Sequence, residues 1–186
     1  MRKALFLIAL GAIYRLLPHP WNAVPMGALA VYAGASFPLR WAWVVPVAAM
    51  GISDFVLDYA VGLPFLAMYR WVNYAAFALI TCLGPLARRP RIGPLMLPGL
   101  SLAASGIFFL VSNFGAWLSP ELGYPRTLGG LTACYIAAIP FLDETVIADL
   151  AGTALFFGMD AVISWIRAWR TSLLAPAAVS IQDVQD

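Results

Sequence analysis

Long apolar runs, separated by short clusters of proline, glycine and charge, constrain the fold of this chain more than any other feature of its sequence. Six of them approach the ~20 apolar residues that a helix needs to cross a bilayer, and a seventh is shorter. The six runs lie at about Ala4–Leu17, Asn22–Phe37, Trp41–Val61, Phe65–Leu86, Leu95–Leu118 and Thr145–Ile166, and the shorter one lies at Leu128–Leu142.

Composition places the chain among membrane proteins. Hydrophobic residues make up 62% of the 186 positions and charged residues 11%, whereas a soluble domain has about 45–50% apolar and about 25% charged residues. We therefore predict an all-α fold, a polytopic membrane helix bundle of six transmembrane helices with a helical or re-entrant outer loop before the last. One integral membrane domain would cover residues 1–170, and a flexible cytoplasmic tail would cover 171–186.

The first two runs are short for membrane spans. At 1.5 Å per residue, fourteen to sixteen helical residues reach only ~21–24 Å of a ~30 Å hydrocarbon core. We expect these two helices to lie against their neighbours near a thinned or water-accessible face of the bundle. That face is a candidate cavity.

The distribution of Lys and Arg predicts the orientation, because cytoplasmic loops carry an excess of these residues. Six spans with an inner N-terminus place eight of the 11 Lys and Arg residues on the cytoplasmic side and leave Arg15, Arg70 and Arg126 outside. If Leu128–Leu142 also crossed, the split would fall to six against five. We therefore expect both termini in the cytoplasm and assign Leu128–Leu142 to a long outer loop, Ser119 to Glu144.

Several functional classes are excluded. A net charge of +2 leaves no basic surface for nucleic acid. Cys82 and Cys134 are too few for a disulfide framework or a structural zinc site. The only histidine is His19, so neither a catalytic Ser/His/Asp or Cys/His arrangement nor a two-histidine metal motif is present. The sequence has no phosphate-binding loop and identifies no cofactor, and we expect a protein that is not an enzyme and hydrolyses no ATP itself.

Ionisable residues within the apolar runs are candidates for function, since a charge in the bilayer costs ~2.5–3.5 kcal/mol on insertion scales. Asp54 and Asp58 are four residues apart and share one face of the third predicted helix. Arg70 begins the fourth helix at the same level. Two alternatives have equal support: a structural ion pair of Asp58 with Arg70 that closes a short outer turn, and contact of these side chains with a ligand.

A second group of polar residues is predicted on the outer side. Asn113 lies in an otherwise apolar helix, where its amide needs partners, and Trp117 follows one turn later on the same face. We expect an outward-facing pocket there, with Trp117 stacking on a ligand and Asn113 and Arg126 binding its polar edge. The predicted substrate-binding residues are Asn113, Trp117, Tyr124, Arg126, Arg70, Asn73 and His19, with Tyr69 beside Arg70.

Some of these positions also have a purely structural explanation. His19 stands between two prolines, where it is either a turn residue or a ligand contact. Asp143 and Glu144 open the last helix, and Asp149 lies about one and a half turns inside it. Acidic residues in a first helical turn favour the helix dipole, so capping explains Asp143 and Glu144.

A series of motifs runs along the chain in a fixed order: Leu17-Pro18-His19-Pro20-Trp21-Asn22, Ser53-Asp54, Ser112-Asn113-Phe114-Gly115-Ala116-Trp117, Tyr124-Pro125-Arg126-Thr127, Gly130-Leu131, Cys134-Tyr135 and Asp149-Leu150. This order resembles a family of small uncharacterised bacterial membrane proteins related to the substrate-binding S components of energy-coupling-factor transporters. The similarity extends from about Leu16 to Gly158.

The resemblance implies a protein of the bacterial cytoplasmic membrane with six helices and an outward-facing cavity that binds a vitamin or a metal ion. The first, third and fifth loops would line this cavity. Such proteins work with a membrane coupling subunit and two cytoplasmic ATPases, or alone, as do cobalamin-specific relatives that use a cysteine thiolate. Cys134 can be compared with that thiolate, although a buried cysteine ordinarily acts as a small hydrophobic residue.

We therefore expect a substrate-binding subunit for uptake of a small organic compound such as a vitamin. The alternative is an accessory structural subunit on the rim of a larger membrane complex, respiratory or photosynthetic, that binds no transported ligand. If Asn113 and Arg126 point to separate surfaces, the uptake interpretation fails and the accessory role replaces it.

Overall fold

The computed structural model describes residues 1–19, 23–61, 67–88 and 96–174. Within these ranges every regular element is helical and no strand occurs, so the predicted all-α class is confirmed. The elements are α1 (Arg2–Leu16), α2 (Met26–Ser36), α3 (Leu39–Ala42), α4 (Val44–Val61), α5 (Met68–Thr81), α6 (Gly84–Ala87), α7 (Met96–Leu118), the short 3₁₀ turn η1 (Pro120–Leu122), α8 (Leu128–Ala138), a second 3₁₀ turn η2 (Ile139–Phe141) and α9 (Leu142–Leu174).

Three helical stretches of the described chain are long and apolar enough to cross a membrane. They are Leu39–Ala60, which joins α3 and α4, Met96–Leu118, which is α7, and Leu128–Leu173, which joins α8, η2 and α9. Large apolar side chains such as Ile52, Leu110 and Ile147 are exposed along these stretches. Soluble proteins rarely expose so many large apolar groups together, so the surface is that of a membrane protein.

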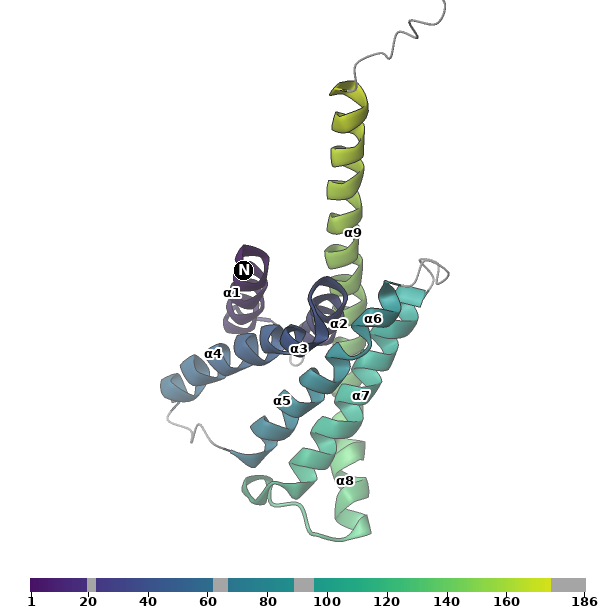
Figure 1. The fold of residues 1–186 in the computed structure, drawn as a ribbon. Helices are drawn as coiled ribbons and strands as arrows, with labels where there is room; N and C mark the ends of the chain where they lie inside the picture. The colour runs from purple at the N-terminus through teal and green to yellow at the C-terminus, as the bar shows by residue number, and fades with distance from the viewer. Residues whose placement is uncertain (20–22, 62–66, 89–95, 175–186) are drawn as a thin grey trace, which may run out of the picture.

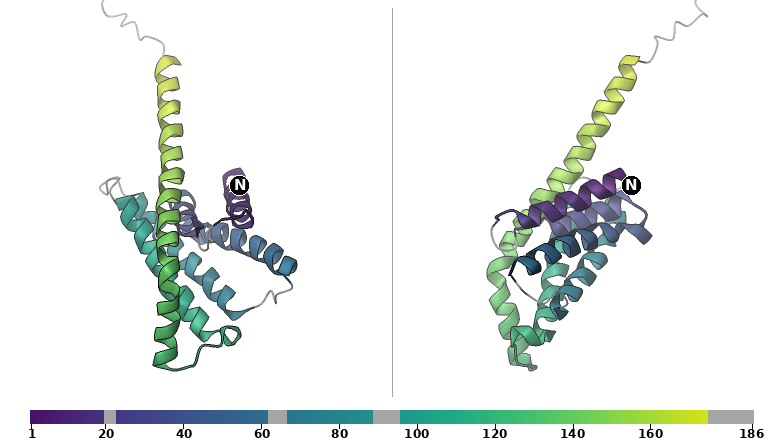
Figure 2. Two further views of the ribbon diagram at one scale, coloured as in Figure 1. Left: turned by 180° about the vertical axis from the view of Figure 1, so that it is seen from behind. Right: turned by 90° about the vertical axis from the view of Figure 1, so that its left-hand side faces the viewer.

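The short helix α2 occupies the centre of the bundle (Figures 1 and 2). Every residue from Met26 to Gly34 is buried, because α4, α5, α7 and α9 pack around it. With 11 residues, α2 is only about 16 Å long. Since the helix ends lie inside the protein, their free N–H and C=O groups need partners from other elements.

Close backbone contact and an arginine fix the C-terminal end of α2. A Cβ on Gly34 would lie 2.0 Å from the carbonyl oxygen of Thr81, and one on Gly84 would lie 2.2 Å from the carbonyl carbon of Gly34. Only glycine fits at this crossing. Arg88 donates hydrogen bonds to the carbonyl oxygens of Gly34 (3.2 Å) and Phe37 (2.9 Å) and so satisfies the end of the helix.

The predicted fourth run, Phe65–Leu86, forms two helices rather than one. Its first two residues lie outside the described ranges, as does Asn22 at the start of the second run. Helix α5 ends at Thr81, and Pro85 lies in the first turn of α6. A proline has no backbone N–H to continue the hydrogen-bond ladder of α5, which explains the break.

The segment Leu128–Leu142 is helical and continues into α9, so that α8, η2 and α9 form one continuous helical rod, which is bent in the right-hand view of Figure 2. It does not turn back as a re-entrant loop would. Pro140 lies within η2, at the start of a helical turn, where its missing N–H costs least. The rod extends to Leu174, into the segment predicted as a tail, because no proline or glycine interrupts residues 159–174.

The chain's N-terminus and the C-terminal end of α9 lie at the same end of the bundle, which is the upper end in Figure 1. The start of α8 and the turn η1 lie at the opposite, lower end. These two ends provide the frame for the polar sites described next.

Candidate functional site

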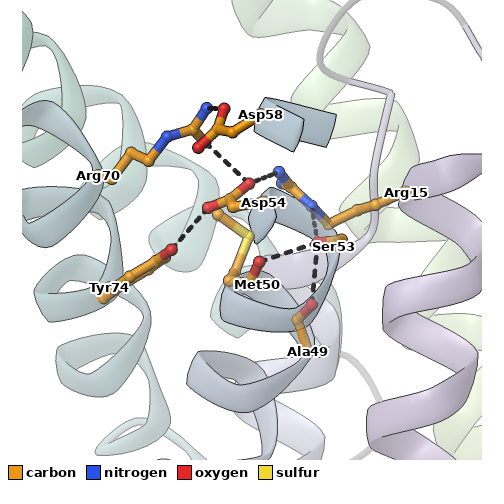
Figure 3. Close-up of polar contacts among 8 residues, drawn as sticks. All are labelled: Arg15, Ala49, Met50, Ser53, Asp54, Asp58, Arg70 and Tyr74. Carbon is orange, nitrogen blue, oxygen red and sulfur yellow. Dashed lines mark hydrogen bonds and ion pairs between the residues drawn. The ribbon is translucent and has the colours of Figure 1, made fainter. Parts of the chain in front are cut away.

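An ionic network joins α1, α4 and α5 inside the bundle (Figure 3). Arg15 of α1 donates hydrogen bonds to Asp54 and, through Nε, to the hydroxyl of Ser53 (2.7 Å), both on α4. Arg70 of α5 pairs with the same oxygen of Asp54 (Nη1 to Oδ1, 3.0 Å) and with Asp58. The structure thus brings Asp58 and Arg70 together, and it makes Asp54 the centre of the network.

The network is buried and carries no net charge. Asp54 is 0% and Asp58 2% exposed, and the side chains of Arg15 and Arg70 are 18% and 11% exposed. Tyr74 completes the shell of Asp54 by donating a hydrogen bond to Oδ2 (2.9 Å). Because two guanidinium groups balance two carboxylates, the cost of removing each ion from water is offset by its partners.

Part of the network still lacks partners among the described residues. Asp58 Oδ2 and Arg70 Nε are buried without a hydrogen bond, and so is the amide oxygen of Asn73, one turn along α5. Buried polar atoms are costly to leave unpaired, and in native proteins water or a bound molecule often supplies the missing bond. The α5 side of the network is therefore a place where a small polar molecule would be stabilised.

Asp149 of α9 forms a second buried polar centre. Its Oδ1 accepts a hydrogen bond from the backbone N–H of Ala28 (2.9 Å), and its Oδ2 accepts one from the Ser105 hydroxyl (2.8 Å). Asp149 is 1% exposed, and no Lys or Arg of the described segments forms an ion pair with it. Since Ala28 lies in the first turn of α2, this carboxyl group caps the N-terminus of the central helix.

The approach of Asp149 to α2 depends on a glycine. A Cβ on Gly27 would lie 2.3 Å from Asp149 Oδ2, which is too close for any side chain. Thus the residue before Ala28 must be glycine for a carboxyl group from α9 to reach the backbone of α2.

A cavity of about 410 Å³ lies at the lower end of the bundle, between α5, α7, η1, α8 and the start of α9. Its volume is within the ~300–1,000 Å³ typical of small-molecule sites. Aromatic and aliphatic side chains form most of its wall, and no charged side chain of the described residues lines it. Its polar lining residues are Tyr69, Asn73, Ser112, Asn113, Tyr124 and Thr145.

A smaller cavity of about 50 Å³ lies next to the large one and shares two of its lining residues, Phe108 and Thr145. Arg15 and Asp149 also line this smaller cavity. The volume suits one or two water molecules with polar partners. The large cavity, the ionic network and the cap of α2 are therefore neighbours in one polar interior.

Three of the predicted substrate-binding residues, Asn73, Asn113 and Tyr124, lie together on the wall of the large cavity. The amide nitrogen of Asn113 donates to the carbonyl oxygen of Phe109 (2.8 Å). The donor side of this amide is therefore partly satisfied within α7 itself. The unpaired amide oxygen of Asn73 is an acceptor without a donor in the described chain.

Trp117 and Arg126 lie outside the lining of this cavity, and so the expected joint contact with Asn113 does not form. Trp117 donates to the carbonyl oxygen of Pro125 (2.8 Å). Arg126 lies 5.7 Å above the ring of Trp117 and donates to the carbonyl oxygen of Leu118. These side chains satisfy backbone carbonyls at the end of α7 and in the loop after it, a requirement of every helix end.

Arg70 and His19 also lie away from the cavity wall. Arg70 is held in the ionic network. The Nδ1 of His19 is hydrogen-bonded to the carbonyl oxygen of Leu17, and its ring lies 5.8 Å from that of Tyr14, an arrangement typical of a turn residue.

In the lower loop, the Ser119 hydroxyl donates to Glu121, and this hydrogen bond lowers the pKa of Glu121.

Cys134 lines the large cavity but is only 2% exposed, and its thiol lies 3.4 Å from the carbonyl oxygen of Asn113. This contact helps α8 to pack on α7. In the described residues no three His, Cys, Asp or Glu side chains gather into a metal-binding group. Cys134 thus has no companion ligand of these types.

Sequence reasoning missed three members of the ionic network, Arg15, Ser53 and Tyr74, and the hydrogen bonds of Asp149. Arg15 lies near the end of the first predicted run, Ala4–Leu17, and was counted on the outer side without a partner. A usable signal was present: two aspartates inside an apolar run require two cations, and only Arg15, Arg70 and Arg126 were predicted on the outer side of the membrane.

The family comparison covers nearly the whole chain. Residues 2–172 match the model of a family of unknown function, DUF6580. The chain belongs to this family. Searches of curated proteins and of solved structures found no significant match. The matched range contains the ionic network, the Asp149 cap and both cavities, so the whole site lies within the family's domain.

Proposed function

We propose that this protein captures a small, uncharged organic molecule from the outer side of a bacterial cytoplasmic membrane and acts as the substrate-binding subunit of an uptake system. The observation that carries the proposal is the cavity of about 410 Å³, which joins an apolar wall to a few convergent polar groups. Such a combination is the usual form of a small-molecule site.

The lining indicates the chemical class of the ligand. Amides and hydroxyls from Asn73, Asn113 and Tyr124 provide donors and acceptors, while Phe108 and Phe109 provide flat apolar surface. An anionic ligand would require a guanidinium or ammonium group on the wall, and the nearby Arg70 is already paired with Asp54 and Asp58. A neutral heterocyclic compound fits these walls best.

The proposed topology has six spans, formed by α1, α2, α3 with α4, α5 with α6, α7, and the rod of α8 and α9. The start of α1 and the C-terminal end of α9 both lie at the upper end of the bundle (Figure 1), as an even number of crossings requires. With the excess of Lys and Arg on that side, the upper end is cytoplasmic. The cavity at the lower end then opens toward the outside, from which a substrate would arrive.

A capture subunit has no ATPase of its own and needs a source of energy. The sequence resemblance to S components supports partnership with a membrane coupling subunit and cytoplasmic ATPases. Ligand capture itself can be tested without these partners, because the cavity is formed entirely by this chain.

The test is mass spectrometry of small molecules released by denaturing the protein after purification in mild detergent. We expect one neutral compound to be released in roughly equal molar amount from the wild type. Ala137→Trp, which places an indole in the cavity wall, and Asn73→Leu, which removes the free acceptor, should both abolish it.

Ala133→Trp is the matched control, since Ala133 lies one turn earlier on α8, is exposed and does not line the cavity. It should retain the compound. Release of no compound from the wild type, or equal release from the Ala137 and Ala133 variants, would overturn the proposal.

The separation of Arg126 from Asn113 counts against uptake and favours the second candidate, an accessory subunit of a larger membrane complex. Arg126 and Asn113 lie apart rather than on one ligand site, and the upper part of α9 extends beyond the bundle with exposed residues such as Trp165 and Trp169. If this role is correct, the wild type should purify within a large assembly, and Ala137→Trp should leave that assembly intact.

A further inference from the structure

A groove of about 540 Å³ lies at the upper end of the bundle, between α1 and α9. Helix α1 packs on α4 and α2, and near the upper end the two helices α1 and α9 stand apart (Figure 1). The buried side chains of Leu7, Tyr32 and Phe156 form the floor of the groove. Its walls carry exposed Phe6 and Met159.

The groove has a polar end and an apolar end. Lys3, Asp160 and Arg167 form the polar end, where Lys3 Nζ lies 3.1 Å from Asp160 Oδ2 and 4.5 Å above the ring of Tyr32. The pair of Lys3 and Asp160 is neutral, so the cation of Arg167 gives this end a net charge of +1. Along α9 the whole groove extends about 18 Å from Arg167 to Leu155 at the apolar end, and Asp160 lies about 8 Å from Leu155.

The dimensions match one leaflet of a bilayer, whose hydrocarbon is ~15 Å deep, half of the ~30 Å core. Exposed groove residues at this depth, such as Phe6 and Met159, would face acyl chains, because water is excluded from the hydrocarbon region. The exposed Trp165 and Trp169 on α9, beside Arg167, have the position of an interfacial aromatic belt. The polar end of the groove therefore lies at the level of lipid headgroups.

We propose that this groove is a binding site for an anionic phospholipid of the cytoplasmic leaflet. One acyl chain lies along the wall formed by Phe6, Leu10, Leu155 and Met159, and the phosphate group lies at Arg167 and Lys3. The negative phosphate is attracted electrostatically to the basic side chains, as acidic headgroups are in basic pockets between other membrane helices. The lipid would fill the space between α1 and α9 and hold the two helices in place.

The experiment measures the thermal unfolding of delipidated wild-type protein in detergent. Three additives are compared: dioleoyl phosphatidylglycerol, dioleoyl phosphatidylcholine with the same chains, and soluble glycerol phosphate. At a concentration near 100 times the dissociation constant, phosphatidylglycerol should raise the Tm by roughly 5 °C. The other two additives should leave the Tm unchanged, because one lacks net charge and the other lacks acyl chains.

Two variants separate the headgroup from the chain. Arg167→Gln removes the cation and should reduce the Tm shift by more than half, whereas the matched control Arg170→Gln, on the same helix but outside the groove, should preserve it. Leu155→Trp narrows the apolar end and should reduce the shift without changing any charge. Native mass spectrometry should show one phosphatidylglycerol bound to the wild type and to Arg170→Gln.

Each other outcome would overturn the proposal. An equal shift with phosphatidylcholine would show a nonspecific lipid effect, and a shift with glycerol phosphate would show a site for free phosphate. Equal losses in Arg167→Gln and Arg170→Gln would show general electrostatic attraction. A dimer without bound lipid in native mass spectrometry would show that a second copy of the chain covers the groove.

Discussion

Two buried acidic centres stand close together in this bundle, and they are stabilised in different ways. The aspartates of α4 are neutralised by guanidinium groups from α1 and α5. Asp149 of α9 is stabilised instead by hydrogen bonds from a backbone N–H at the N-terminus of α2 and from a serine hydroxyl. The first centre depends on charge balance, whereas the second depends on a hydrogen-bond acceptor of the right shape at a helix end. Substitutions that remove charge but keep shape should therefore separate them.

The largest effect is expected from Asp54→Asn, because Asp54 accepts from Arg15, Arg70 and Tyr74. Removing its charge leaves two buried cations with only Asp58, and the free energy of unfolding should fall by about 3–5 kcal/mol. Unfolding by sodium dodecyl sulfate in mixed micelles measures the loss. The exposed Asp143→Asn is the control, and equal losses in both variants would contradict a charge-balanced network.

Asp58→Asn should cost less, about 1.5–3 kcal/mol, because Arg70 keeps its ion pair with Asp54. Thermal melting followed by circular dichroism would report this as a lower Tm. An unchanged Tm combined with loss of the captured compound would instead give Asp58 a role in ligand binding.

Gly27→Ala tests the contact that lets Asp149 reach α2. The new Cβ would lie 2.3 Å from Asp149 Oδ2, so the carboxyl group must move, at a cost of about 1–3 kcal/mol. Gly106→Ala is the control, since a Cβ there meets nothing within 4 Å, and it should be neutral or stabilising. Equal effects in both variants would show that Asp149 adjusts without loss. The measurement is the midpoint of denaturation in mixed micelles.

The smallest effect is expected from Asp149→Asn, about 0.5–2 kcal/mol, because an amide oxygen can still accept from the N–H of Ala28. Asp149→Leu removes the acceptor and should cost more than Asp149→Asn in the same thermal melt. A loss from Asp149→Asn as large as that from Asp54→Asn would mean that Asp149 depends on its charge, and the contrast between the two centres would disappear.

Much of the helical framework could be predicted from the sequence. The runs that ended at proline, glycine or charge became helices. The first two runs were predicted to be short for membrane spans, and the helices formed there, α1 and α2, have only 15 and 11 residues. The continuity of the rod was not predicted, because the count of Lys and Arg assigned Leu128–Leu142, with Pro140, to an outer loop before the last helix. Within η2 that proline costs little, and so the helix continues.

Among the residues of the candidate site, some could be placed from the sequence and others could not. Asn113 was predictable as a cavity residue because a polar group in an apolar segment needs partners, and Tyr124 because it lies in the loop that follows this segment on the outer side. Arg126 and Trp117 were assigned to the same ligand because they are close in sequence. The loop after α7 turns them onto backbone carbonyls instead, and loop conformation is not encoded by spacing alone.

The sequence by itself determined the class of the fold, the apolar segments and the need for every buried charge to have a partner. It did so because hydrophobicity and helical periodicity are local properties of the chain. Which groups meet was decided by tertiary structure. Arg15 and Asp54 are 39 residues apart and Ala28 and Asp149 are 121 apart, and contacts at such separations depend on how helices cross, which local pattern does not specify.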